Sequence, residues 1–159
     1  MKTLLSRAAL AAAAIALGLS GAQATTTATA NLNVSLQVTS SCAVSATPLT
    51  FPQSTLSSNA DATATISVTC GSGASYSVTL GDGQHSAGSG LRLMASSSGT
   101  IEYQLYSDTL RNTAWFGAAA VPGTGTGAAQ PITVYGRVPA SPGATPGAYS
   151  DQVQITVTY

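Results

Sequence analysis

The chain has 159 residues and a formal net charge of zero, and only 6% of its residues are charged. Globular domains usually carry about a quarter of charged residues, so this chain is poor in them. Because the few cations form no basic patch, the composition argues against nucleic acid and anionic membranes as partners. Weak repulsion between copies suits a chain that packs against itself, but an ordinary secreted β-protein rich in Ala and Thr would have the same composition.

The first 24 residues have the organisation of a secretory signal peptide. Lys2 and Arg7 form a positive start, residues 8–19 are mostly apolar, and residues 22–24 (Ala-Gln-Ala) form a small-residue cleavage site. The apolar stretch is short for a spanning helix, so a membrane anchor is the less favoured interpretation. Cleavage leaves residues 25–159, enough for one domain, with three arginines against five carboxylates. We therefore expect an exported protein without direct membrane insertion.

An alternating run opens the predicted mature chain. From residue 27 to residue 38 every even position is apolar and every odd position is polar. Successive side chains of a strand point to opposite faces, so the run predicts a strand with one apolar face. It is about twice as long as an ordinary strand, and chain ends are poorly ordered unless something ties them down. Such a strand needs an apolar groove, in its own domain or in another molecule.

Two cysteines follow, Cys42 and Cys70. An even number of cysteines in an exported chain predicts one disulfide, with two free reactive thiols as the alternative. The bridge would close a loop of about 29 residues and stabilise the fold by roughly 3.5 kcal/mol through loop-closure entropy. We expect no metal site, because His85 is the only other soft ligand.

Short alternating runs recur along the rest of the chain, and none has helical periodicity. Their apolar positions fall within residues 62–70, 76–80, 91–93, 101–105, 132–138 and 149–159. The stretches 118–131 and 139–146 are rich in small residues and proline and are predicted loops. Several short strands with turn signals at this spacing favour an all-β fold, an antiparallel β-sandwich.

No set of residues has the pattern of an enzyme site. His85 is the only base available to a serine nucleophile, and it lies between glycines, where a loop tip is expected. The five acids flank turns and strands, where turn formation and solubility explain them. We therefore predict no enzymatic activity and no cofactor.

The main aromatic cluster in the sequence comprises Tyr103, Tyr106, Trp115 and Phe116. Such rings could stack on a sugar. Core packing is the favoured interpretation for Tyr103, because it alternates with polar neighbours.

Three stretches together resemble the spore coat protein U family, the subunits of archaic chaperone–usher pili. The first is the alternating run that leads to Cys42-Ala43-Val44. The second is residues 103–108 (Tyr-Gln-Leu-Tyr-Ser-Asp), followed by Trp115 and Gly117. The third is residues 135–139, then residues 146–151 (Pro-Gly-Ala-Tyr-Ser-Asp) and the terminal run 153–159. The likeness covers nearly the whole predicted mature chain.

The resemblance implies an immunoglobulin-like antiparallel β-sandwich that lacks its final strand. In such subunits a periplasmic chaperone fills the vacant apolar groove, and an outer-membrane usher guides assembly. The N-terminal strand of the next subunit, a copy or a related subunit, then replaces the chaperone by β-strand addition. Residues 25–38 would be this donor extension, and residues 39–159 the single sandwich domain. The resemblance also matches Cys42 and Cys70 to the family disulfide.

The resemblance assigns roles to individual apolar residues. The expected donor residues are Ala30, Leu32, Val34, Leu36 and Val38. Val153, Ile155 and Val157 are expected on the terminal strand that flanks the groove and first meets the chaperone. The implied function is a structural subunit of an adhesive surface pilus that supports attachment and biofilm formation. The alternatives are a self-contained secreted coat or matrix protein, which would use residues 27–38 as its own strand, and a carbohydrate-binding adhesin.

Overall fold

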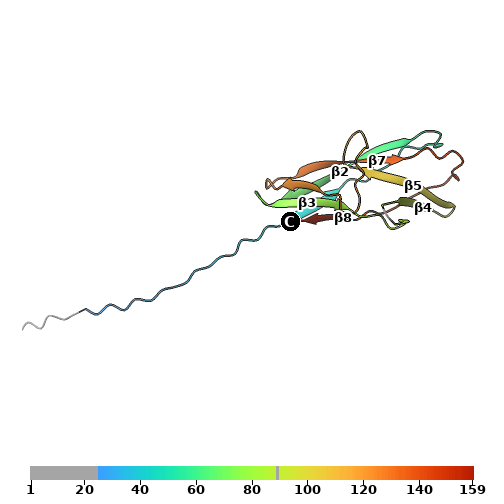
Figure 1. Ribbon diagram of the computed structural model, residues 1–159. Coiled ribbons are helices and arrows are strands. Elements are labelled where there is room, and N and C mark those ends of the chain that lie inside the picture. Colours follow the sequence, from blue (N-terminus) through green and yellow to red (C-terminus); the bar gives the residue numbers. More distant parts are fainter. Residues whose placement is uncertain (1–24, 89) are drawn as a thin grey trace, which may run out of the picture. The chain divides into compact units, whose positions relative to one another are not determined.

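All eight regular elements in the part of the chain that the structure describes are β-strands. The computed structural model describes residues 25–88 and 90–159, so the predicted signal peptide lies outside the described residues. The strands are β1 (Cys42–Ala46), β2 (Ala60–Cys70), β3 (Ser75–Leu80), β4 (Arg92–Ser96), β5 (Gly99–Tyr106), β6 (Val121–Thr124), β7 (Gln130–Val138) and β8 (Ile155–Thr158) (Figure 1). No helix of the described residues is long and apolar enough to cross a membrane.

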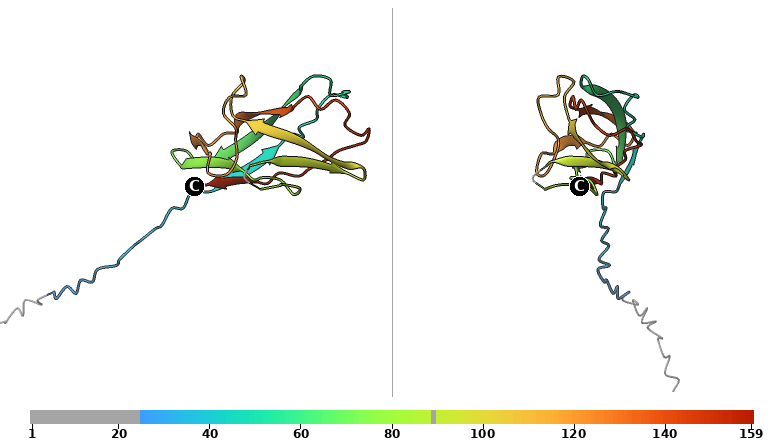
Figure 2. Two further views of the ribbon diagram at one scale, coloured as in Figure 1. Left: turned by 45° about the vertical axis from the view of Figure 1, so that its right-hand side comes forward. Right: turned by 90° about the vertical axis from the view of Figure 1, so that its right-hand side faces the viewer.

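The strands form two antiparallel sheets that pack face to face. One sheet has the order β1-β2-β7-β5-β4 and the other the order β6-β3-β8. Figure 2 shows the two layers from two further directions. The predicted all-β fold, an immunoglobulin-like antiparallel sandwich, is confirmed.

The core lies between the sheets and follows from the alternation of β2 and β3. Along β2, Ala64, Ile66 and Val68 point inward, while the Thr and Ser residues between them are only partly buried. Burial of such a row of aliphatic side chains stabilises the fold by about 1.5–3 kcal/mol for each large residue. The predicted core role of Tyr103 is confirmed, since its side chain is buried among these residues.

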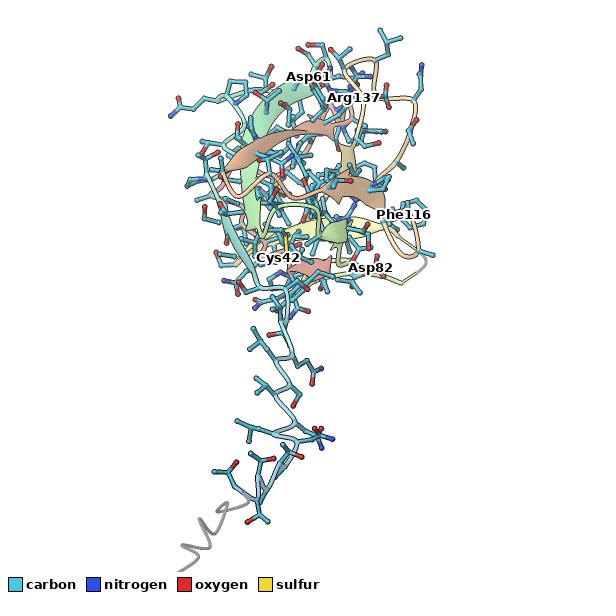
Figure 3. The ribbon with its side chains drawn as sticks, turned by 90° about the vertical axis from the view of Figure 1, so that its left-hand side faces the viewer. Cys42, Asp61, Asp82, Phe116 and Arg137 are labelled. Atoms are coloured by element: carbon cyan, nitrogen blue, oxygen red, sulfur yellow. A yellow bond between two sulfur atoms is a disulfide. The ribbon has the colours of Figure 1, made fainter. Side chains whose placement is uncertain are left out.

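The predicted disulfide is present between Cys42 and Cys70, so the alternative of two free thiols is wrong. The two residues face each other in the ladder of β1 and β2. Figure 3 labels Cys42 at the start of the first strand. The bridge ties β1 to the sheet at the residue where the N-terminal segment joins the domain.

The sequence predicted a loop over the whole stretch 118–131, and this prediction is wrong in part. The stretch contains β6, and β7 begins at Gln130 within it. Val121 pairs with Val78, and Gly123 lies against the ring of Tyr76, where a side chain would collide with that ring. Because β6 is short and rich in Pro and Gly, it lacks the alternation by which strands are recognised.

The short run at 91–93 leads into β4, which begins at Arg92, but its buried residue is not the predicted one. The sequence favoured Leu91 and Leu93 as the apolar pair, whereas the structure buries Arg92 completely and leaves Leu91 exposed. The guanidinium donates to Gly81 O (2.7 Å), Trp115 O (2.8 Å) and Gln104 Oε1 (2.5 Å). The carbonyls of Gly81 and Trp115 come from separate parts of the chain and need donors once they are buried. This need decides which face of the strand points inward.

Candidate functional site

A large apolar groove enters the sandwich between two irregular segments. Residues 46–56, which follow β1, form one wall, and residues 144–155, which lead into β8, form the other. The cavity measures about 940 Å³. Its apolar lining includes Leu49, Phe51, Ile66, Leu80, Met94, Ile101, Tyr103, Leu105, Val134, Val138, Val153 and Ile155. The core of the domain is therefore accessible from one side.

Both sheets end beside this opening in a strand with a free edge. Among the described residues, β1 pairs only with β2, and β8 pairs only with β3. Val44 on β1 pairs with the fully buried Val68 but is itself 42% exposed, so the inward face of β1 is incompletely covered. A free edge carries unpaired backbone N–H and C=O groups, which can pair with another strand.

The two edge strands run in opposite directions. Cys42 pairs with Cys70 and Thr158 pairs with Ser77, and β2 connects to β3 through the short turn at residues 71–74. The start of β1 and the end of β8 therefore lie at the same end of the sandwich. An extended segment in the groove could bond to a free edge and bury alternate side chains in the core, as an added strand requires.

The residues predicted to fill a groove lie in a segment without sheet pairing. Residues 25–41 form no strand, so the strand predicted at 27–38 has no ladder of its own here. Ala30 is exposed, and the exposed fractions of Leu32, Val34, Leu36 and Val38 are 88%, 85%, 87% and 84%. Four large apolar side chains at alternate positions, each exposed to water, are typical of a surface that binds a partner.

The predicted groove-edge residues lie on either side of the strand boundary. Ile155 and Val157 belong to β8, whereas Val153 precedes it, so the regular strand is shorter than predicted. Val153 and Ile155 line the groove, and Val157 packs against the core without lining it. Contact of these residues with a chaperone remains a prediction.

The aromatic cluster does not form an exposed platform. Trp115 is buried, and its indole N–H donates to Val78 O at 3.2 Å. Tyr103 is buried as well, which leaves Tyr106 and Phe116 as the partly exposed rings of the cluster. Figure 3 labels Phe116 on the loop beyond β5. Stacking of Trp115 on a sugar would require the core to open.

A polar cluster at the groove was not recognised in the sequence. The carboxylate of Asp151 accepts hydrogen bonds from the Tyr103 hydroxyl (2.6 Å) and from Nδ1 of His85 (2.9 Å). Burial opposes ionisation of Asp151, but these bonds outweigh it and hold the pKa of its carboxyl below the usual range. Burial, and then the bond to Asp151, raises the pKa of Tyr103, so its hydroxyl remains a donor.

We expect the domain to lose stability as the pH falls below about 4. A hydrogen bond from Arg137 lowers the pKa of Asp61, and a hydrogen bond from the Thr113 N–H lowers the pKa of Asp108. The pKa of Asp151 is lowered by the hydrogen bonds described above. A carboxyl with a depressed folded pKa stabilises the fold above its unfolded pKa of about 3.9, and this contribution disappears as the pH falls through the folded value. The unfolding temperature, followed by circular dichroism, should be nearly constant above about pH 5 and decline below about pH 4. An unchanged unfolding temperature in strong acid would contradict this assignment.

No group of three or more His, Cys, Asp or Glu side chains in residues 25–88 and 90–159 is placed to hold a metal ion. His85, the only candidate base, is engaged by Asp151. The groove, with its apolar lining and two free strand edges, is therefore the feature of the described residues best suited to bind a partner.

Comparison with known proteins gives a family match and a curated relative. The family described as Spore Coat Protein U domain matches residues 28–156. Protein U of Myxococcus xanthus is 34% identical over 91 residues, which cover 52% of this chain and 51% of that protein, so the chain spans about half the length of this relative.

A solved structure shares the fold. It is the chaperone–tip adhesion subunit pre-assembly complex of CsuC and CsuE, from the archaic chaperone–usher Csu pili of Acinetobacter baumannii. The TM-score is 0.61 at 16% identity, and the match covers 77% of this chain and 40% of the matched chain. At this identity the likeness concerns the fold.

Proposed function

This chain belongs to the spore coat protein U domain family, and we propose that it is a structural subunit of a surface pilus assembled by donor-strand complementation. In this scheme the extension 25–38 of one subunit occupies the groove of the next. The observation that carries the proposal is the complementarity of two features, an apolar groove between free strand edges and an unpaired segment with a single apolar face.

The energetics favour this pairing. Burial of Leu32, Val34, Leu36 and Val38 contributes on the order of 5–10 kcal/mol before the costs of association. Ala30 and Ala28 add little because their side chains are small. Head-to-tail donation is a heterologous contact that need not close on itself, so it produces a fibre.

The open apolar groove also indicates which partners the subunit needs before it enters a fibre. A sandwich with an open core is an aggregation hazard, so the subunit needs a periplasmic chaperone in the groove until a donor arrives. We propose that an outer-membrane usher then guides exchange and export, and that the fibre serves attachment and biofilm formation at the cell surface. The similarity to a subunit from chaperone–usher pili supports this assignment over a catalytic one.

The alternatives receive less support from the described residues. A self-contained coat protein would use residues 27–38 as a strand of its own sheet, whereas residues 25–41 form no strand. A carbohydrate-binding adhesin would present its large aromatic side chains, whereas Trp115 and Tyr103 are buried.

Deletion of residues 25–38 should abolish fibres and leave chaperone binding intact, because the groove is built from residues after the extension. The full and shortened chains would be co-expressed with the proposed chaperone and usher, and complexes and fibres would be measured by co-purification and electron microscopy. Fibres from the shortened chain, or loss of chaperone binding together with fibres, would contradict the proposal.

A further inference from the structure

The buried carboxylate of Asp151 connects the two sheets at the wall of the groove. Its Oδ2 accepts the hydrogen bond of the Tyr103 hydroxyl, which comes from β5 of the five-stranded sheet. Its Oδ1 accepts from the backbone N–H of Gln84 (3.0 Å) and of His85 (3.3 Å), and from His85 Nδ1 (2.9 Å). The latter two residues follow β3 of the other sheet, and the Asp151 side chain is only 2% exposed.

The turn after β3 is shaped around this carboxylate. Gly83 has a φ of +88°, and a Cβ at this position would collide with Asp151 Oδ2. Only glycine combines that backbone conformation with such a close approach. Charged groups near the cluster include the buried Arg92, whose pKa is lowered by burial, an effect that Tyr103, Asp82 and Asp151 only partly offset.

Four further hydrogen bonds hold the groove wall at residues 150–154. Ser150 exchanges two backbone hydrogen bonds with Ala95 (2.9 and 3.0 Å), and Gln154 O accepts from Gly81 N (2.9 Å). The side chain of Gln152 accepts from Gln84 Nε2 (2.7 Å). Between these anchors, residues 151–154 belong to no strand. Asp151, Val153 and Ile155 all line the groove, so the hydrogen bonds that hold the Asp151 side chain also restrain the segment that carries Val153 and Ile155.

We propose that Asp151, held by Tyr103, His85 and the 84–85 backbone, is a positioning residue that sets the groove wall for capture of the donor strand. This inference rests on the proposed function. An asparagine at this position has the same size but loses the charge, and its amide group cannot accept from all four donors. The amide oxygen could still accept from the 84–85 backbone, but the amide NH2 group cannot accept from the Tyr103 hydroxyl. The wall would then lose its link to β5, and the positions of Val153 and Ile155 would be less firmly fixed.

The test is a binding titration with a synthetic peptide of residues 27–40. The acceptor is the whole mature chain carrying Val34→Asp, which disables its own extension as a donor. Asp151→Asn should weaken peptide binding about tenfold, and Tyr103→Phe, which keeps the ring in the groove, should weaken it several-fold. The matched control is Asp61→Asn, which breaks the ion pair with Arg137 on another surface and should change affinity less than about twofold.

The unfolding temperature of every variant separates positioning from general stability. A purely structural role would make affinity follow unfolding temperature for all three variants, including Asp61→Asn, and that result would overturn the inference. If Asp151→Asn does not fold, Tyr103→Phe decides, since unchanged peptide affinity in that variant would also overturn it. Absence of binding to the acceptor chain itself would overturn the proposed function as well, whereas equal binding by all variants would overturn this inference alone.

Discussion

Substitution of Val34 by aspartate should abolish fibre formation by the mature chain. Val34 lies in the middle of the apolar face of the extension, between Leu32 and Leu36, and its side chain is 85% exposed before assembly. In a neighbour's groove this side chain would enter an apolar core. A carboxylate without a partner there costs several kcal/mol, and about 3 kcal/mol already weakens an equilibrium more than 100-fold.

The matched control for Val34→Asp is Ser35→Asp. It introduces the same charge one residue later, on the polar face, which points away from the core when the strand is bound. Fibres would be measured as the sedimentable fraction and by negative-stain electron microscopy. We expect near-normal fibres from Ser35→Asp and none from Val34→Asp. Equal loss in both variants would show that charge, rather than the apolar face, determines assembly, and normal fibres from Val34→Asp would exclude this segment as the donor.

Substitution of Arg92 by methionine should strongly destabilise the domain. Arg92 is fully buried, and its guanidinium supplies donors to Gly81 O, Trp115 O and the Gln104 side chain. Methionine fills much of the space but leaves these buried acceptors without donors, at a cost of about 1–3 kcal/mol for each unsatisfied group. We expect a loss of about 3 kcal/mol in the free energy of unfolding, and roughly 10 °C in unfolding temperature.

Arg137→Met is the matched control for Arg92→Met. Arg137 pairs with Asp61 through two hydrogen bonds of 2.8 Å, and Figure 3 shows the two labelled residues beside each other. This pair is partly exposed, so its loss should cost less than about 1 kcal/mol. Thermal and denaturant unfolding of the two variants would measure the difference. Equal stability of Arg92→Met and the unchanged chain would show that the buried guanidinium is not required.

The fold class was predictable because local periodicity and burial agree along most strands. The alternation of β2 (Ala60–Cys70) is the same in the sequence and in the buried positions, since one face of a sheet packs on the core. The disulfide was predictable from two cysteines in an exported chain. β6 was missed because its four residues include Pro and Gly, and only its pairing with β3 makes it a strand.

The candidate site was predictable only in part. The one-faced extension is visible in the sequence as an even–odd pattern, because a strand repeats every two residues whatever it binds. The groove is not visible, because it consists of side chains from both sheets and from two irregular segments distant in the chain.

The sequence by itself determined that this chain forms strands, that it carries one disulfide and that its extension has a single apolar face. Only the tertiary structure decided that Arg92 points inward and that Asp151 meets Tyr103 and His85. Hydrophobic periodicity is a local property that neighbouring residues express together. The position of a buried polar group depends on donors and acceptors that come together only when both sheets have formed, and these lie 48 and 66 residues from Asp151 along the chain.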